Sequence, residues 1–178
     1  MSNRYPIGKF TPPAEYTPEL RAGFVRDIAA APAAIRSAVA GLTSEQRLTP
    51  YRDGGWTVAQ VVHHVADSHM HAYARMKFAV SEDVPTIKAY DENVWAAFVD
   101  ASSPDVEPSL RLIDALHTRW AAFLGQLRAA DFERGLVHSE NGPMTVDRLV
   151  ALYAWHGRHH AAHIAALRAR KGWGQVLN

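Results

Sequence analysis

The chain has 178 residues, of which 48% are hydrophobic and 21% are charged, and its formal net charge at neutral pH is +1. This length and composition predict one globular domain with a buried core, and the near-neutral charge gives no support for a nucleic-acid or membrane-surface partner. Cysteine is absent, which excludes disulfides, thiolate metal ligands and a cysteine nucleophile. No apolar stretch approaches the roughly 20 residues of a membrane span, and the N-terminus lacks a signal-peptide core, so we expect a cytoplasmic protein.

The N-terminal third predicts an extended arm followed by a long helix. Residues 1–16 are rich in proline and read as an arm. Thr17 is a typical helix N-cap with proline at the first helical position, and apolar residues then recur at helical spacing to about residue 40. Pro32 falls inside this pattern, so we expect a kink or a break there.

Two capping-box patterns begin the next helices. Thr43–Gln46 starts a short helix, and Thr57–Gln60 starts a long one that continues to about Val80. Residues 83–106 contain two prolines and read mostly as loop, with a short helical piece near residues 92–98.

The C-terminal half predicts two further long helices. One begins near Pro108, and the other runs from Thr145 to about Arg170. The turn-rich link between them, residues 131–143, allows a short pair of strands near Leu136–His138 and Met144. Four long amphipathic helices predict an all-α antiparallel four-helix bundle, formed by a single domain over residues 1–178 with the arm at its start.

Ten histidines are the most informative feature of the composition, and four of them fall within residues 156–163. The core stripe of the last helix steps by four and three residues, through Leu149, Tyr153, His156, His160, His163 and Leu167. His156 and His160 are one helical turn apart on one side, so their imidazoles can bind one metal ion. His159 with His163 is a competing pair, although His159 lies off this stripe.

A third inward histidine lies on the helix that begins after Thr57. His64 lies beside apolar positions, and a bundle interior can host a metal between facing helices. Three neutral imidazoles from His64, His156 and His160 suit zinc, nickel or cobalt, and three protein ligands plus water are typical of an open, catalytic site. The alternative is that these are hydrogen-bonded core histidines without a metal.

The remaining polar residues receive secondary roles. Each ligand needs an acceptor for its second ring nitrogen, and the nearby candidates are Asp67, Ser68 and Tyr153. We expect His163 to pack against or support the site rather than to bind the ion. Three histidines of the second long helix are expected on a partly exposed polar edge, and two others on the surface or in loops; these are His63, His69, His71, His117 and His138. Three arginines are expected at the solvated surface, with binding of a carboxylate-bearing substrate as the alternative; they are Arg52, Arg75 and Arg158.

Several sequence blocks together resemble the YfiT proteins of the DinB superfamily over nearly the whole chain. They are YPIG at 5–8, TPYRDGGWT at 49–57, QVVHHVADSHM at 60–70, YDE at 90–92, LHTRW at 116–120 and LYAWHGRHHAAHI at 152–164. The resemblance implies a DinB-type bundle, commonly a homodimer, with one divalent ion per chain. Its three histidine ligands correspond to His64, His156 and His160, and zinc and nickel are both expected occupants.

The resemblance also implies an enzyme. Members of the family are described as metal-dependent hydrolases, and relatives as transferases that attach low-molecular-weight thiols such as bacillithiol to electrophiles. Our leading hypothesis is therefore a metal-dependent S-transferase whose partners are a small thiol and an electrophile. One alternative is a hydrolase that uses metal-bound water with Asp67 as the base. Another is a protein in which the metal only stabilises the bundle, or a sensor, with His163 or His63 as a fourth ligand.

Overall fold

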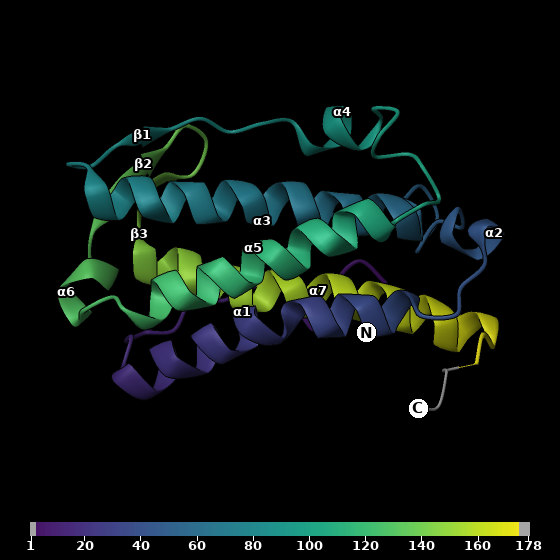
Figure 1. The fold of residues 1–178 in the computed structure, drawn as a ribbon, viewed down its shortest axis with the longest axis horizontal. Coiled ribbons are helices and arrows are strands. Elements are labelled where there is room, and N and C mark those ends of the chain that lie inside the picture. Colours follow the sequence, from purple (N-terminus) through teal and green to yellow (C-terminus); the bar gives the residue numbers. More distant parts are fainter. Residues whose placement is uncertain (1–2, 175–178) are drawn as a thin grey trace.

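Four long helices make up most of the computed structural model, which describes residues 3–174 (Figure 1). They are α1 (Pro18–Val39), α3 (Val58–Ser81), α5 (Glu107–Gly125) and α7 (Val146–Lys171). The four-helix bundle expected from the sequence is confirmed. No helix in the described part of the chain combines the length and apolar character needed to cross a membrane.

The helices begin where the sequence predicted. The hydroxyls of Thr17, Thr57 and Thr145 accept hydrogen bonds from backbone N–H groups in the first turns of α1, α3 and α7. Thr43 forms a capping box with Gln46 at the start of the short helix α2 (Ser44–Arg47). Of the kink or break expected at Pro32, the break is wrong, because α1 continues through that residue to Val39.

The bundle is arranged as a ring in which α1 and α3 each contact both α5 and α7. The chain direction in Figure 1 shows that α1 and α7 run parallel to each other, as do α3 and α5, whereas α1 with α5 and α3 with α7 are antiparallel. Parallel α3 and α5 require a connection that returns along the whole bundle. Residues 82–106 make this crossover on the outside of α3, and they include β1 (Thr86–Ile87) and α4 (Glu92–Ala96).

A small sheet closes one end of the bundle. β2 (Gly135–His138) pairs antiparallel with β3 (Gly142–Thr145), which confirms the strand pair expected in this link. β1 adds to β2 in parallel, with Thr86 opposite Val137, and the short helix α6 (Ala129–Phe132) precedes β2. Two residues are too few to show an alternating pattern, so β1 was not predictable from the sequence.

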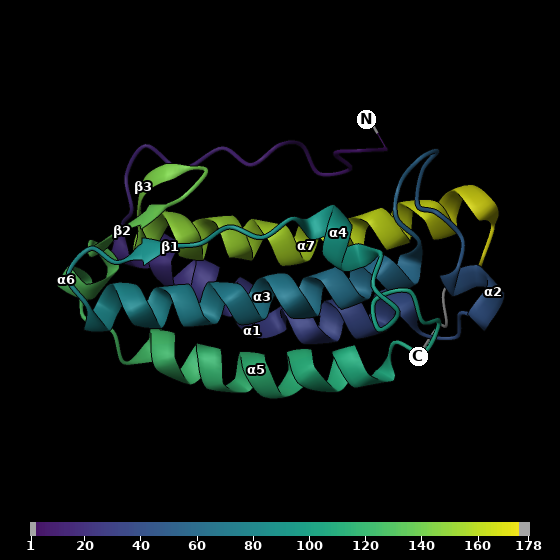
Figure 2. The same ribbon diagram turned by 90° about the horizontal axis from the view of Figure 1, so that it is seen from above.

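The N-terminal arm lies along α7, as Figure 2 shows from above. The Tyr5 ring stacks on His159 at a centroid distance of 6.0 Å, and Phe10 contacts Trp155 at the same distance. The arm expected over residues 1–16 is thus present from residue 3, whereas residues 1–2 lie outside the described part.

The core consists of two apolar clusters with buried histidines between and beside them. One cluster contains Ile28, Met76, Trp120 and Leu149, and the other contains Ile35, Val62, Ile113 and Ile164. Buried histidines on three helices lie between or beside these clusters, and they are His64 and His69 on α3, His117 on α5, and His160 and His163 on α7. We call this set, together with His156, the histidine layer.

Candidate metal centre

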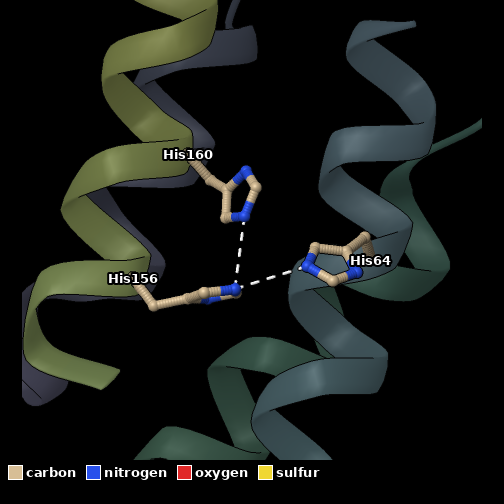
Figure 3. A group of neighbouring side chains, drawn as sticks. All are labelled: His64, His156 and His160. Atoms are coloured by element: carbon tan, nitrogen blue, oxygen red, sulfur yellow. Dashed lines mark hydrogen bonds between the residues drawn. The ribbon is translucent and has the colours of Figure 1, made fainter. Parts of the chain in front are cut away.

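Three imidazole nitrogens meet between α3 and α7 (Figure 3). The Nε2 atom of His156 lies 3.3 Å from Nε2 of His64 and 3.2 Å from Nε2 of His160. One ligand atom from each of these residues lies within 4.8 Å of the others. The structure therefore brings together the three histidines that the sequence singled out.

The spacing of these nitrogens fits a tetrahedral ion. Zinc binds imidazole nitrogen at 2.0–2.1 Å, so neighbouring nitrogens of a tetrahedral site are about 3.3 Å apart. The two short Nε2–Nε2 distances agree with this value. The third pair, from His64 and His160, lies within 4.8 Å.

Burial keeps these rings in the neutral form that binds metals. Desolvation lowers the pKa of His64 to about 4. The pKa values of His156 and His160 also lie well below the ordinary histidine value, because both rings are buried and because neighbouring histidines disfavour a second positive charge. The cluster therefore presents unprotonated nitrogen at neutral pH.

Aromatic rings hold the cluster in place. The Trp56 ring lies 4.6 Å from the His64 ring, and the Tyr51 ring lies 4.1 Å from that of His163. Both aromatic residues come from the loop that precedes α3, so the same short segment supports the candidate ligand His64 on α3 and the neighbouring His163 on α7.

Of the residues predicted to support the metal ligands, His163 and Tyr153 lie beside the cluster and Asp67 does not. His163 approaches the site, with its Nδ1 3.4 Å from Nδ1 of His160, and the Tyr153 ring packs against His156 at 5.4 Å. The Tyr153 hydroxyl lies 3.3 Å from Ser68 Oγ rather than bonding to a candidate ligand. Asp67 is not among the clustered residues, and the charged groups that affect its pKa are Asp100 and His63.

Several histidines expected near the surface are buried instead. The prediction for His69 and His117 is wrong, since their exposed fractions are 0% and 1%. His63 is also buried, with Nε2 donating to the Ser103 carbonyl and Nδ1 accepting from the Ser109 hydroxyl. Its partners come from the crossover and α5, which cover a face of α3 that a lone amphipathic helix would expose.

A signal for two of these residues was present in the sequence. His69 lies four residues after Val65 and three before Ala72, and His117 has the same spacing to Ile113 and Trp120. This is the spacing of a core face. His138 and His159 are buried as well, and His159 lies beneath the arm against Tyr5.

Two cavities border the cluster. The larger, of about 360 Å³, is lined by all three clustered histidines and by Arg52. The smaller, of about 200 Å³, is lined by His156, Tyr153 and Arg75. His156 and Glu92 line both cavities, so the cavities meet at one candidate ligand and one carboxylate.

Glu92 and Arg75 are the residues here whose location the sequence reasoning missed. Partial desolvation, together with the neighbouring carboxylates of Asp91 and Glu140, raises the pKa of the Glu92 carboxyl above its ordinary value, although the residue is exposed at the rim of the cavities. Arg75 was expected at the solvated surface, which is wrong, since it is 7% exposed and donates from Nη2 to the Lys88 carbonyl. Its Nε has no hydrogen-bond partner among the described residues.

The comparisons with known proteins agree with this architecture. The family model described as the DinB superfamily matches residues 27–164. A protein of Geobacillus thermodenitrificans named "Putative metal-dependent hydrolase" is 51% identical over 96% of both chains. A protein of Oceanobacillus iheyensis with the same description is 46% identical, over 97% of this chain and 100% of its own.

A solved structure extends the likeness to three dimensions. YfiT from Bacillus subtilis, described as a probable metal-dependent hydrolase with an unusual four-helix bundle topology, is 42% identical with a TM-score of 0.94. The alignment covers 97% of this chain and 99% of that one. The chain therefore belongs to the DinB superfamily.

Proposed function

We propose that this protein is a metal-dependent S-transferase that joins a low-molecular-weight thiol to an electrophile. The observation that carries the proposal is the meeting of two cavities at His156 and Glu92. A reaction between two small molecules needs room for both, with the reacting atoms side by side. One reactant would occupy the larger cavity, and the other would occupy the smaller one.

His64, His156 and His160 would hold a divalent ion, and zinc and nickel both suit three imidazoles. When bound, such an ion acts as a Lewis acid that lowers the pKa of a thiol or of water. The two histidines considered as a fourth ligand, His63 and His163, are both engaged elsewhere. Both ring nitrogens of His63 are bonded, and His163 is engaged by His160 and by the Arg4 carbonyl. This arrangement favours an open position for substrate over a purely structural metal.

Glu92 would act as the general base and then as the general acid. Its carboxylate would accept the thiol proton, after which the sulfur attacks an electrophilic carbon, forming a C–S bond while the bond to the leaving group breaks. The same carboxyl would then donate that proton to the departing atom. The upward direction of its pKa shift favours the protonated form that the second half of this exchange needs.

Two arginines would orient the reactants. Arg52 lines the larger cavity, and the buried Arg75 lines the smaller one. Guanidinium groups recognise carboxylates through paired hydrogen bonds, so we expect each reactant to carry an anionic group.

Hydrolysis is the second candidate, and two observations favour it. Glu92 could equally deprotonate a water molecule, and the relatives described above are named as metal-dependent hydrolases. Asp67, the base considered from the sequence, lines neither cavity, so Glu92 takes its place in this candidate.

One experiment separates the two candidates. Zinc- or nickel-loaded protein is incubated with bacillithiol, glutathione, mycothiol or cysteine and a chlorobimane acceptor, and product is compared with metal-free protein. In parallel, the loaded protein is given a panel of esters and amides without thiol. Metal-dependent thioether formation supports the transferase, whereas hydrolysis without thioether formation replaces it by the hydrolase.

A further inference from the structure

A chain of buried hydrogen bonds leads from His156 to the backbone of α1. Nδ1 of His156 lies 3.0 Å from Nε2 of His69, whose Nδ1 lies 2.8 Å from Nε2 of His117. Nδ1 of His117 in turn lies 2.6 Å from the carbonyl oxygen of Ile28. The three rings come from three different helices, α7, α3 and α5.

The carbonyl at the end of this chain determines where every proton lies. A carbonyl oxygen only accepts, so His117 must carry its proton on Nδ1 and leave Nε2 as an acceptor. His69 then donates from Nδ1 and accepts at Nε2, and His156 donates from Nδ1. Because burial favours neutral rings with one proton each, Nε2 of His156 is left with a free lone pair directed at the cluster.

A second, shorter chain has the same effect on His160. Nε2 of His163 lies 3.1 Å from the carbonyl oxygen of Arg4, so that nitrogen is the donor. Nδ1 of His163 is then an acceptor for Nδ1–H of His160, at 3.4 Å. His160 is therefore also left with a lone pair on Nε2.

We propose that these two histidine relays, His117–His69 and His163, are positioning devices that set both candidate ligands of α7 as Nε2 acceptors before any metal arrives. Two such lone pairs face each other across 3.2 Å with no proton between them. A cation between them turns this repulsion into two bonds. The inference rests on the metal site of the proposed function but not on the reaction proposed for it.

The relay explains why the core tolerates so much histidine. His69 and His117 line neither of the cavities that reach the cluster. If their role were only to fill space, apolar side chains would do so without the need to satisfy four ring nitrogens. Partners of metal-binding histidines orient the ring and select its tautomer, and losing one typically costs about 10- to 100-fold in metal affinity.

The direct test is long-range 1H–15N NMR on metal-free, untagged protein. We expect His156 and His160 to show protonated Nδ1 and unprotonated Nε2. Protonated Nε2 on His156 or His160 overturns the proposal. This measurement needs no variant and no metal, so it stands even if the protein fails to bind zinc, a result that would count against the proposed function alone.

Zinc affinity, measured by competition with a chromophoric chelator, tests the relay by substitution. His117→Phe removes the acceptor for His69, and we expect affinity to fall about 10- to 100-fold. His117→Gln keeps an oxygen able to accept from His69, so its affinity is expected within about threefold of wild type. His63→Phe is the matched control, because it removes a buried, hydrogen-bonded histidine of α3 that is not connected to the relay.

The pattern across the variants decides the outcome. A folded His117→Phe protein with wild-type zinc affinity contradicts the relay, as does an equal loss in His63→Phe. A loss specific to His117→Phe that is restored in His117→Gln supports it. Circular dichroism on each variant establishes folding.

Discussion

Arg21 and Asp147 form a two-point ion pair that joins α1 to the first turn of α7. Arg21 Nε lies 2.8 Å from Asp147 Oδ1, and Arg21 Nη2 lies 2.6 Å from Oδ2. The two side chains are only 13% and 5% exposed. Since α1 and α7 run parallel along the whole bundle, this pair ties together their starting ends (Figure 1).

We expect Asp147→Asn to lower the free energy of unfolding by about 3 kcal/mol, because it removes the buried counter-charge nearest to a largely buried guanidinium. Urea denaturation of metal-free protein measures the change. Glu133→Gln is the control, since Glu133 lies 3.8 Å from the same arginine but is 70% exposed, and we expect a change below about 0.5 kcal/mol. Equal effects of the two substitutions would contradict the importance of burial.

Removing one candidate ligand should abolish stoichiometric metal binding. Elemental analysis of untagged protein is expected to find one zinc or nickel per chain in the wild type and almost none in His156→Ala. His156 is the most informative position because its Nε2 lies beside both other rings. His71→Ala is a suitable control, since His71 stacks on Tyr90 outside the cluster, and a loss of metal there would point to a different site.

Metal should also stabilise the folded chain. An ion that binds only the native state adds about 2.7 kcal/mol at a free concentration one hundred times its Kd. We expect zinc to raise the thermal midpoint of the wild type and to leave that of His156→Ala unchanged. A similar rise in both proteins would mean that the ion binds elsewhere.

Acid should destabilise the metal-free protein through the histidine layer. The pKa of His64 is about 4 in the folded chain, below its ordinary value of 6.5. In the unfolded chain His64 is protonated below about pH 6.5, whereas in the folded chain it stays neutral down to about pH 4. The contribution of His64 to the free energy of unfolding is therefore fully present above about pH 6.5 and is lost as the pH falls from about 6.5 to about 4. The loss from His64 alone is on the order of 3 kcal/mol.

Urea denaturation at several pH values between 7.5 and 4 follows this loss. His64→Leu removes the titrating ring and is expected to show a shallower dependence than the wild type. Identical slopes in the two proteins would show that His64 does not titrate as its burial requires.

A close approach between α1 and α7 makes Gly157 sensitive to substitution. A Cβ at this position would lie 3.0 Å from the Cβ of Ala31, which cannot rotate away. We expect Gly157→Ala to destabilise the protein by about 1 kcal/mol, because crowding outweighs the better helix propensity of alanine. Gly23→Ala, where the nearest atom is 3.8 Å away, is expected to be neutral or stabilising, and a stabilised Gly157→Ala would be inconsistent with the crowding.

Glu92→Gln should separate proton transfer from metal binding. The substitution keeps the shape of the side chain but removes its ability to accept a proton, so we expect metal-dependent turnover to fall about 10²- to 10⁴-fold. Zinc affinity should stay unchanged, because Glu92 is not among the clustered nitrogens. Asp67→Asn is the control, and a greater loss there would return the role of base to Asp67.

Local signals account for what the sequence predicted correctly. Threonine caps and helical spacing mark the starts of the long helices, and the same spacing places His156 and His160 on one face. Such features depend only on neighbours within a few turns. The facing His64 was identified in the same way, from the apolar residues beside it.

What the sequence did not predict depends on contacts between distant segments. The burial of His63 follows from the path of the crossover, and the location of Glu92 beside the cluster depends on that path too. No periodic pattern in residues 82–106 encodes that path. His69 and His117 differ from these residues, because their spacing in the sequence indicates a core position. The polarity of histidine outweighs that spacing in the prediction, which places them near the surface.

The crossover has a consequence for how this architecture can diversify. A hairpin between α3 and α5 would leave the cluster without Glu92 and without the walls that Tyr90 and Asn93 provide. Because the crossover lies outside the ring of helices, its length and sequence can change without moving α3 and α7, the two helices that carry the candidate ligands. Grafting this one segment between relatives should exchange substrate preference and leave the ion untouched.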